Sequence, residues 1–393
     1  LPQITPSNSL LVKYGHSYLF IRMKILQLGK FYPVKGGVEK VAYDLMTGIS
    51  EQGIRCDMMC ATVSGTGQTH DINPYAHLFT CHTWFEYAAT MIAPTMLTRL
   101  REECGAYDIL HIHHPDPMAC LALWASGYKG KVVVHWHSDI QKQKYLLRLY
   151  KPLQDWMLRR ADLVIATSPV YLEQSPYLQA VHGKTVCLPI GVEAMRPRPA
   201  FAEVIREKYH RRKIVFTLGR LVAYKGYNHL VEAARYLDDS YIVLIGGTGA
   251  LRDELQAQIG RLGLQDKVKL LGRIPDDNLA SYYGACSVFC LSSVMKTEAF
   301  GIVQAEAMSC GKPVVATNIP QSGVPWVNAH GVSGLNVEPG NPRALAEAIR
   351  EITRDEPTYQ AYSEGARKRY ECLFTKRRMI RECIGLYENL INR

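Results

Sequence analysis

Short apolar runs alternate with amphipathic stretches along most of the chain. Helical periodicity of the hydrophobic residues is clear at 38–51 and 144–160, between runs rich in valine, isoleucine and leucine. Nearly continuous apolar strands separated by helices are typical of parallel strands that are buried on both faces. In the first half of the chain the pattern predicts strands at 24–29, 54–61, 108–113, 131–137, 162–168 and 185–191.

The same alternation restarts after a proline-containing stretch at 195–200. This second array predicts strands at 213–219, 241–247, 267–272, 287–293 and 313–318, and helices at 227–237, 250–262, 303–309 and 343–353. The tail at 358–392 is expected to be helical throughout. Together the two arrays predict an α/β protein with two Rossmann-like, doubly wound parallel-sheet domains that face a cleft.

The pattern also sets the expected domain limits. We place the first domain at 23–194, the second at 200–370, and a C-terminal helix at 371–393 that crosses back to the first domain. Residues 1–22 do not share the alternating pattern of the remaining chain, the chain does not begin with Met, and Met23 opens a strand as a natural start would. We therefore expect residues 1–22 to be a leader or an expression remnant without function.

Composition supports a globular protein with an acidic partner. The chain has 393 residues, of which 47% are hydrophobic and 21% charged, so it can form sizeable cores. Lys and Arg number 46 against 36 Asp and Glu, a net charge of +10. Such an excess favours nucleic acid, an anionic lipid surface or a phosphorylated ligand, unless the chain is simply basic with no special partner. Nucleic acid is disfavoured because no recognition motif is present and the charge is spread over both domains.

The eleven cysteines do not suggest a disulfide framework. They are scattered, several lie in apolar runs, and there is no Cys-x-x-Cys pair. We interpret them as small buried side chains in a reducing compartment, without a zinc site. No apolar stretch approaches the roughly 18 to 20 residues of a membrane span, and no signal peptide is recognisable. A cytoplasmic location is expected.

Ligands of open parallel sheets bind at the carboxyl ends of the strands, and several polar motifs lie there. Gly36 and Gly37 follow the first strand, where they allow close approach of a ligand and leave helix N–H groups for an anion. A plain tight turn is the alternative.

His135 and His137 end a later strand, and His111, His113 and His114 end the one before it. We expect no metal, because no carboxylate or cysteine arrangement completes a ligand set.

Two further motifs follow strands of the second domain. Gly219-Arg220 precedes Lys225-Gly226, and two cations at this spacing can converge on a diphosphate, although two solvated cations are the alternative.

Glu298 lies in a loop, Gly301 opens the next helix, and Glu306 lies within it. The helix N-terminus offers N–H groups to an anion while each acid reaches a different part of one ligand. A loop acid that only favours the helix dipole is the alternative reading of Glu298.

In this order the motifs resemble the retaining glycosyltransferases of family 4, which have the GT-B fold. The resemblance covers essentially residues 23–393. The stretches 135–140, 162–169 and 322–328 are similar to bacterial O-antigen and capsule sugar transferases, with mannosyltransferases most similar. The first domain is then expected to bind the acceptor and the second domain the nucleotide sugar.

The resemblance implies a role for each motif. Arg220 and Lys225 would bind the donor diphosphate, Glu298 the donor sugar hydroxyls and Glu306 the ribose hydroxyls. His137 would lie beside the donor sugar, although His135 on the same strand face remains an alternative. The implied donor-binding set also contains Gly36, Gly37, Gly219, Arg273, Ile274, Ala299, Phe300, Gly301, Ile302 and Val303.

The implied reaction is retaining and independent of metal or other cofactors. No Asp-x-Asp pair is evident, and Asp276-Asp277 is interpreted as a helix cap. The expected donor is GDP-mannose and the expected acceptor a lipid-linked or polysaccharide chain in surface polysaccharide synthesis. A UDP-sugar transferase (glucose or N-acetylglucosamine) that acts on a small soluble acceptor is the alternative. A phosphorylase or epimerase with the same two-domain fold is also considered, but a pyridoxal-phosphate phosphorylase needs a much longer chain.

The stretch 140–160 is both basic and amphipathic. Its cations are Lys142, Lys144, Arg148, Lys151, Arg159 and Arg160, and its apolar residues are Tyr145, Leu146, Leu149, Tyr150, Leu153, Trp156 and Met157. We expect either peripheral contact with an anionic membrane, at the inner face of the cytoplasmic membrane, or a core-facing helix with a solvated basic face.

Overall fold

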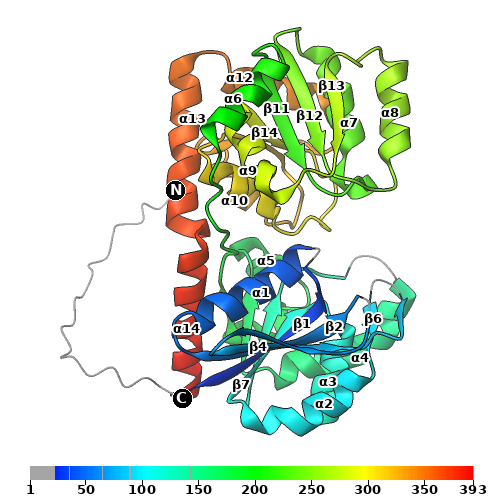
Figure 1. The fold of residues 1–393 in the computed structure, drawn as a ribbon, viewed down its shortest axis with the longest axis vertical. Helices are drawn as coiled ribbons and strands as arrows, with labels where there is room; N and C mark the ends of the chain where they lie inside the picture. Colours follow the sequence, from blue (N-terminus) through cyan, green and yellow to red (C-terminus); the bar gives the residue numbers. More distant parts are fainter. Residues whose placement is uncertain (1–22, 35, 64, 88–89, 141–143, 393) are drawn as a thin grey trace, which may run out of the picture.

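The computed structural model describes residues 23–392 apart from 35, 64, 88–89 and 141–143, so the expectation for residues 1–22 lies outside the described residues. Two α/β domains follow one another along the chain, and a long C-terminal helical segment runs beside both of them (Figure 1). The expected fold class is confirmed. Among the described residues, no helix is long and apolar enough to span a membrane.

The first domain contains an eight-stranded sheet in the order β10-β9-β8-β7-β1-β2-β4-β3, in which all pairs are parallel except β3 with β4. Its strands are β1 (Lys24–Tyr32), β2 (Arg55–Thr62), β3 (Thr69–Asn73), β4 (Ala76–Cys81), β7 (Ile109–His114), β8 (Lys131–Trp136), β9 (Leu163–Ala166) and β10 (Thr185–Cys187). A separate hairpin consists of β5 (Phe85–Tyr87) and β6 (Thr90–Ile92). The helices are α1 (Gly37–Ser50), α2 (Thr95–Glu103), α3 (Pro117–Ser126), α4 (Lys144–Arg160) and α5 (Pro169–Gln174).

The second domain contains a six-stranded parallel sheet in the order β13-β12-β11-β14-β15-β16. Its strands are β11 (Lys213–Leu218), β12 (Tyr241–Gly246), β13 (Val268–Gly272), β14 (Val288–Leu291), β15 (Val314–Thr317) and β16 (Gly334–Val337). Its helices are α6 (Pro199–Lys208), α7 (Tyr227–Ala233), α8 (Arg252–Arg261), α9 (Asp276–Ala285), α10 (Ile302–Ser309), α11 (Val324–Val327) and α12 (Pro342–Ile352).

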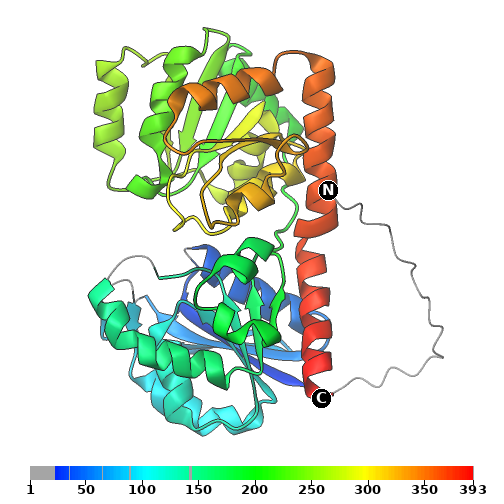
Figure 2. The ribbon, with the colours of Figure 1, turned by 180° about the vertical axis from the view of Figure 1, so that it is seen from behind.

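The C-terminal segment consists of α13 (Glu356–Arg369), a π-helical turn (Tyr370–Phe374) and α14 (Lys376–Ile391). It passes from the second domain to the first, as both views show (Figures 1 and 2). The tail that was predicted to be helical throughout has one break, because Thr375 is extended and pairs with Val192 of the interdomain linker. Beyond this break α14 packs on α1, where a Cβ added at Gly48 would lie 2.0 Å from Ile380 Cδ1.

Several short elements were missed from the sequence. The strands β3 to β6 and β16 are short or weakly apolar, so they lack the continuous hydrophobic run that marked the others. The acids Asp276 and Asp277 begin α9 within its first turn, while the N-cap residue is Pro275. The prediction that they cap the helix was therefore wrong, although acids in a first turn still favour the helix dipole.

The topology fixes where a ligand can bind. The chain starts each sheet in the middle, at β1 and β11, and extends it first to one side and then to the other. The order therefore reverses between β1 and β7 and between β11 and β14. In doubly wound sheets, ligands bind outside the carboxyl ends of the strands at this reversal.

Candidate functional site

The residues that follow the two reversal points meet where the domains face each other, a region we call the domain junction. A Cβ added at Gly37 would lie 2.8 Å from Ile302 Cδ1, so the start of α1 contacts the start of α10. Nearby, Lys296 Nζ lies 3.7 Å from Asp139 Oδ2 across the junction. Sequence reasoning did not identify Lys296, because nothing in the sequence marks a loop lysine that pairs with a distant aspartate.

A buried ion pair forms the centre of the second-domain side. Lys225 Nζ lies 2.6 Å from Glu298 Oε2, and the two side chains are only 10% and 11% exposed. Burial by itself lowers the pKa of Lys225, but Glu298, together with Tyr227 and Tyr224, more than offsets this effect and holds that pKa above its ordinary value. Both charges are therefore fixed in position beside the carboxyl ends of β11 and β14.

The residues around the Lys225–Glu298 pair include two serines and a glycine that hold the pair in place. Ser293 Oγ donates to Glu298 Oε2 at 2.9 Å, and Ser322 Oγ donates to the Glu298 carbonyl oxygen at 2.5 Å. Gly219 has φ +156°, and a Cβ there would lie 3.3 Å from Lys225 Nζ and 2.8 Å from Tyr227 Oη. Glycine at 219 thus allows the lysine ammonium to lie directly against the end of β11.

The start of α10 lies next to this pair and offers backbone donors. Gly301, the N-cap residue, has φ +71°, and a Cβ there would lie 2.7 Å from Leu291 Cδ2. Because glycine has no capping side chain, the first N–H groups of α10, including those of Ile302 and Val303, remain suited to an anion. Phe300 instead packs in the core against Trp326 and edge-on to Phe374, so its ring belongs to the scaffold of the loop.

Glu306 lies inside α10. Its Oε2 accepts a hydrogen bond of 2.7 Å from Tyr283 Oη. Burial raises the pKa of Glu306, while Tyr283 and the Lys40 ammonium of the first domain oppose that shift. Tyr283 was not identified from the sequence, since an aromatic residue within a helix carries no distinguishing signal.

Arg220 is exposed, in contrast to Lys225, so the two predicted cations differ sharply in environment. The charge of Arg220 acts on Glu39, whose carboxylate accepts hydrogen bonds from the backbone N–H groups of Gly36 and Glu39 itself. Burial nevertheless raises the pKa of Glu39. Two of the N–H groups near Gly36-Gly37 are therefore already used by a carboxylate of the same helix, and the binding role of this turn stays a prediction.

Two other predicted donor-binding residues lie farther out, at the end of β13. Ile274 is buried, and its Cδ1 would lie 2.7 Å from a Cβ added at Gly246. Arg273 is exposed beside it. Ala299 lies in the Glu298 loop, where its carbonyl oxygen accepts a hydrogen bond of 2.8 Å from the Gly323 N–H. Their binding roles stay predictions.

The histidines form one buried group on the first-domain side. His111 and His113 on β7, His135 on β8, and His137 just beyond β8 stack on one face of the sheet. His137 lies farthest toward the carboxyl edge, which favours it over His135 as the junction residue. Burial lowers the pKa of His137 to about 3, so its imidazole is neutral near pH 7.

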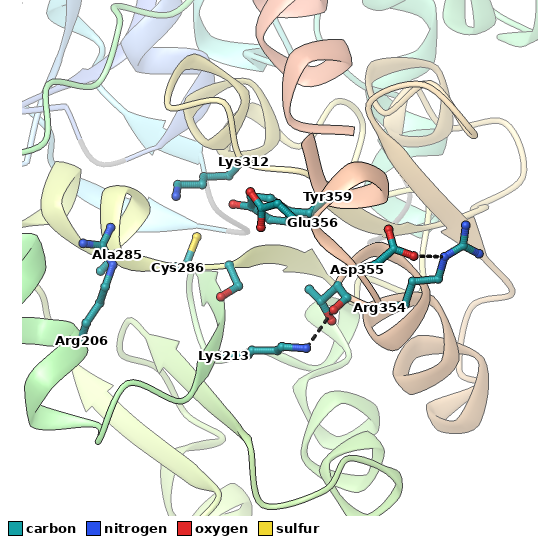
Figure 3. A pocket seen from close by; sticks show the side chains of 11 residues that line it. Arg206, Lys213, Ala285, Cys286, Lys312, Arg354, Asp355, Glu356 and Tyr359 are labelled. Atoms are coloured by element: carbon teal, nitrogen blue, oxygen red, sulfur yellow. Dashed lines mark hydrogen bonds and ion pairs between the residues drawn. The ribbon is translucent and has the colours of Figure 1, made fainter. Parts of the chain in front are cut away.

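A cavity of about 460 Å³ lies away from this junction (Figure 3). It is lined by Lys213 at the start of β11 and by Ser287 and Lys312, which precede β14 and β15. These positions are at the amino edge of the sheet, opposite the reversal point. Lys213 Nζ donates to the Thr353 carbonyl oxygen at 2.8 Å, and this cavity is not part of the candidate site.

Comparison with known proteins identifies the family of the chain. The model of the family described as Glycosyltransferase Family 4 matches residues 35–196, and that described as Glycosyl transferases group 1 matches residues 201–369. O-antigen chain mannosyltransferase C of Escherichia coli is 31% identical over 94% of this chain and 99% of its own length. D-rhamnosyltransferase WbpZ of Pseudomonas aeruginosa is 32% identical over 90% of this chain and 92% of its own.

Solved structures support the fold. HepE from Anabaena in complex with UDP has a TM-score of 0.75 at 22% identity, and covers 93% of this chain and 100% of that one. Sucrose-phosphate synthase from Thermosynechococcus elongatus has a TM-score of 0.78 at 22% identity, with 94% and 100% covered. The two-domain architecture is thus the one found in these solved structures.

Proposed function

Because the chain belongs to glycosyltransferase family 4, we propose that it transfers mannose from GDP-mannose, with retention of configuration, to a lipid-linked or polysaccharide acceptor in surface polysaccharide synthesis. The observation that carries this proposal is the buried Lys225–Glu298 pair beside the glycine N-cap of α10 at the domain junction. The names of the two relatives, a mannosyltransferase and a rhamnosyltransferase, support a sugar of this type.

The proposed chemistry is based on the charges at the junction. As the donor sugar leaves, negative charge develops on the nucleoside diphosphate, and fixed donors in a water-poor site stabilise it. Lys225, Arg220 and the N–H groups at the start of α10 supply that stabilisation. The buried Glu298 accepts hydrogen bonds from the sugar hydroxyls, and Glu306 accepts those from the ribose in place of Tyr283.

His137 completes the site from the first domain. Its imidazole is neutral, so it acts on the sugar as a hydrogen-bonding group and not as a cation. Retention is assigned to attack by the acceptor on the face from which the diphosphate departs, with no protein nucleophile. The acceptor then approaches from the first domain, near Gly37.

A donor panel tests the proposal. Purified protein is incubated with GDP-mannose, UDP-glucose or UDP-N-acetylglucosamine and a lipid-linked acceptor fraction, with Glu298→Gln as the matched control of reduced activity. We expect GDP release only with GDP-mannose, and an α-linked product by NMR. Turnover of a UDP-sugar onto a small soluble acceptor would instead establish the alternative, and a β-linked product would exclude retention.

We predict that transfer needs no divalent cation at the diphosphate, because Lys225, Arg220 and the α10 N-terminus supply the positive charge. Activity in a brief assay with excess EDTA should stay within about twofold of the untreated value, and added Mg²⁺ or Mn²⁺ should not raise it. Complete loss in EDTA with recovery on adding Mn²⁺ would contradict this arrangement.

The structure of α4 limits which of its residues can contact a membrane. Tyr150, Leu153, Trp156 and Met157 pack against the first-domain core, which is the alternative stated for the apolar face. Arg148 is exposed and Leu149 is 79% exposed, while Lys151 pairs with Asp155 on the surface. The β5–β6 hairpin adds the exposed aromatic residues Trp84, Phe85 and Tyr87. We propose that these groups contact an anionic membrane at its cytoplasmic face.

Reversing two charges on α4 should weaken that contact. Arg148→Glu with Lys151→Glu removes about 1 kcal/mol of attraction per cation and adds repulsion, so vesicle binding should fall at least about tenfold. Sedimentation with phosphatidylglycerol vesicles at low and high salt measures it. The control is Lys208→Glu with Arg235→Glu, two exposed cations of the second domain. Equal binding by both double variants would leave α4 with its structural role alone.

A further inference from the structure

The face of the first-domain sheet beneath α14 carries polar side chains in place of the apolar residues expected in a core. His111, His113 and His135 are all 0% exposed, and their ring centroids lie 4.7 to 5.4 Å apart. Strand register explains the grouping, since His113 of β7 pairs with His135 of β8 and Gln27 of β1 pairs with His111. One potential ligand nitrogen from each ring lies within 4.8 Å of the others.

Several of these nitrogens have no hydrogen-bond partner among the described residues: His111 Nε2, both ring nitrogens of His135, and His137 Nδ1. Leaving a buried polar atom unpaired is unfavourable. Several unpaired ring nitrogens in one place therefore indicate a bound group that would pair with these nitrogens. Bound water can satisfy some of the nitrogens. Water, however, does not explain why three imidazoles converge on one point.

The hydrogen bonds around the group orient two of the rings. Tyr387 of α14 contacts His111 Nδ1 through its hydroxyl, and Gln27 Oε1 lies 2.9 Å from His113 Nε2. Gln27 Nε2 in turn donates to Tyr387 Oη at 3.1 Å. Both oxygens can therefore accept ring N–H groups, which leaves lone pairs at His111 Nε2 and His113 Nδ1. Oxygen acceptors that fix the tautomer in this way are the usual outer partners of metal-binding histidines.

We propose that His111, His113 and His135 bind a divalent transition-metal ion of the zinc class. Zinc binds imidazole nitrogen at about 2.0–2.1 Å, which places ligand nitrogens about 3.3 Å apart in a tetrahedral site. The rings must therefore move together by about 1 Å, and His113 Nδ1 must release its 2.9 Å contact with His137 Nε2. The ion joins β7 and β8 on the face of the sheet that also carries His137. The proposed ion has no part in binding the donor diphosphate, for which the proposed function requires no metal.

The expectation of no metal relied on the missing carboxylates and cysteines. Three neutral imidazoles and a water molecule also form a recognised zinc ligand set, and only the strand register shows that these histidines converge. Neutral rings are the ligand form, and the burial of this group keeps them neutral.

The test measures metal content and needs no activity. Tag-free protein is purified without added metal, unfolded with EDTA, and refolded with Zn²⁺ or Co²⁺ before extensive dialysis. We expect about one equivalent of Zn²⁺ per chain by mass spectrometry, visible absorption typical of tetrahedral Co²⁺, and a melting temperature several degrees above that of the metal-free protein.

His135→Val removes one ligand with a residue suited to a strand that already contains Val132, Val133 and Val134. Its zinc content should fall at least about tenfold, while its circular dichroism matches that of the metal-free wild type. The exposed His182→Gln of the same domain is the control and should retain full occupancy. Substoichiometric zinc in the wild type, octahedral Co²⁺ spectra, or equal zinc in His135→Val would each overturn the site.

Discussion

Replacing Lys225 with alanine should lower transfer by about two to three orders of magnitude and also destabilise the second domain. The activity falls because the fixed cation beside the leaving diphosphate is lost. The stability falls because Glu298, 11% exposed, keeps a buried charge without its partner at 2.6 Å. Removing one member of a buried pair costs about 3–5 kcal/mol, which lowers the melting temperature by on the order of 10 °C.

The double variant Lys225→Ala with Glu298→Gln separates the two effects. Neutralising both partners should recover much of the lost stability, because no unpaired charge remains, while transfer stays low. Lys208→Ala, an exposed lysine of the same domain, is the control and should change neither property. Normal turnover and an unchanged melting temperature for Lys225→Ala would remove this residue from the site.

The metal-free protein should lose stability steeply as the pH falls below about 6.5. Burial lowers the pKa values of His111, His113, His114, His135 and His137, with His114 and His137 at about 3. The unfolded chain binds protons at these positions from about pH 6.5 downward, whereas the folded chain does not. Each histidine therefore lowers the free energy of unfolding by about 1.4 kcal/mol per pH unit. The five histidines together lower it by about 7 kcal/mol per pH unit.

Buried acids act in the opposite sense and reduce this slope. Burial raises the pKa of Asp116 to about 7 and also raises those of Glu39 and Glu306, so the folded state binds protons there before the unfolded state does. Stability from these acids is present at low pH and is lost as the pH rises. The net effect should still be a loss of stability as the pH falls below 6.5, because five buried histidines outnumber the three buried acids.

Melting temperatures from pH 8 to pH 5 measure this effect. His135→Val should have a slope that is shallower by about 1.4 kcal/mol per pH unit, whereas the exposed His182→Gln should follow the wild type. A melting temperature that is constant between pH 7 and pH 5 would show that the histidines are not buried as neutral groups.

The apolar pattern was sufficient to predict the two sheets and the edges at which the site lies. Long buried strands such as β1, β8 and β12 carry continuous hydrophobic runs, and the glycines and charged residues that come after strands mark the carboxyl edge. The hairpin β5–β6 has no such run, since Phe85, Glu86 and Tyr87 are all exposed, and it was missed.

Contacts between distant segments could not be predicted from the sequence. Lys225, which was expected to be open to the diphosphate, is instead paired with the Glu298 carboxylate. The capping of α1 by Glu39 depends on how that helix is buried at the junction. Likewise, the convergence of His111, His113 and His135 depends on strand register, which the sequence does not specify.

Calorimetry with GDP on the wild type, Glu298→Gln and Glu306→Gln tests most directly where the two ends of the donor bind. A charge-assisted hydrogen bond to the ribose contributes about 1.5–3 kcal/mol, so Glu306→Gln should weaken GDP binding at least about tenfold. Glu298→Gln should bind GDP nearly as the wild type does, yet transfer mannose about 10 to 100 times more slowly. If Glu298→Gln abolishes GDP binding and Glu306→Gln leaves it unchanged, the assignment of Glu298 to the sugar and Glu306 to the nucleotide is contradicted.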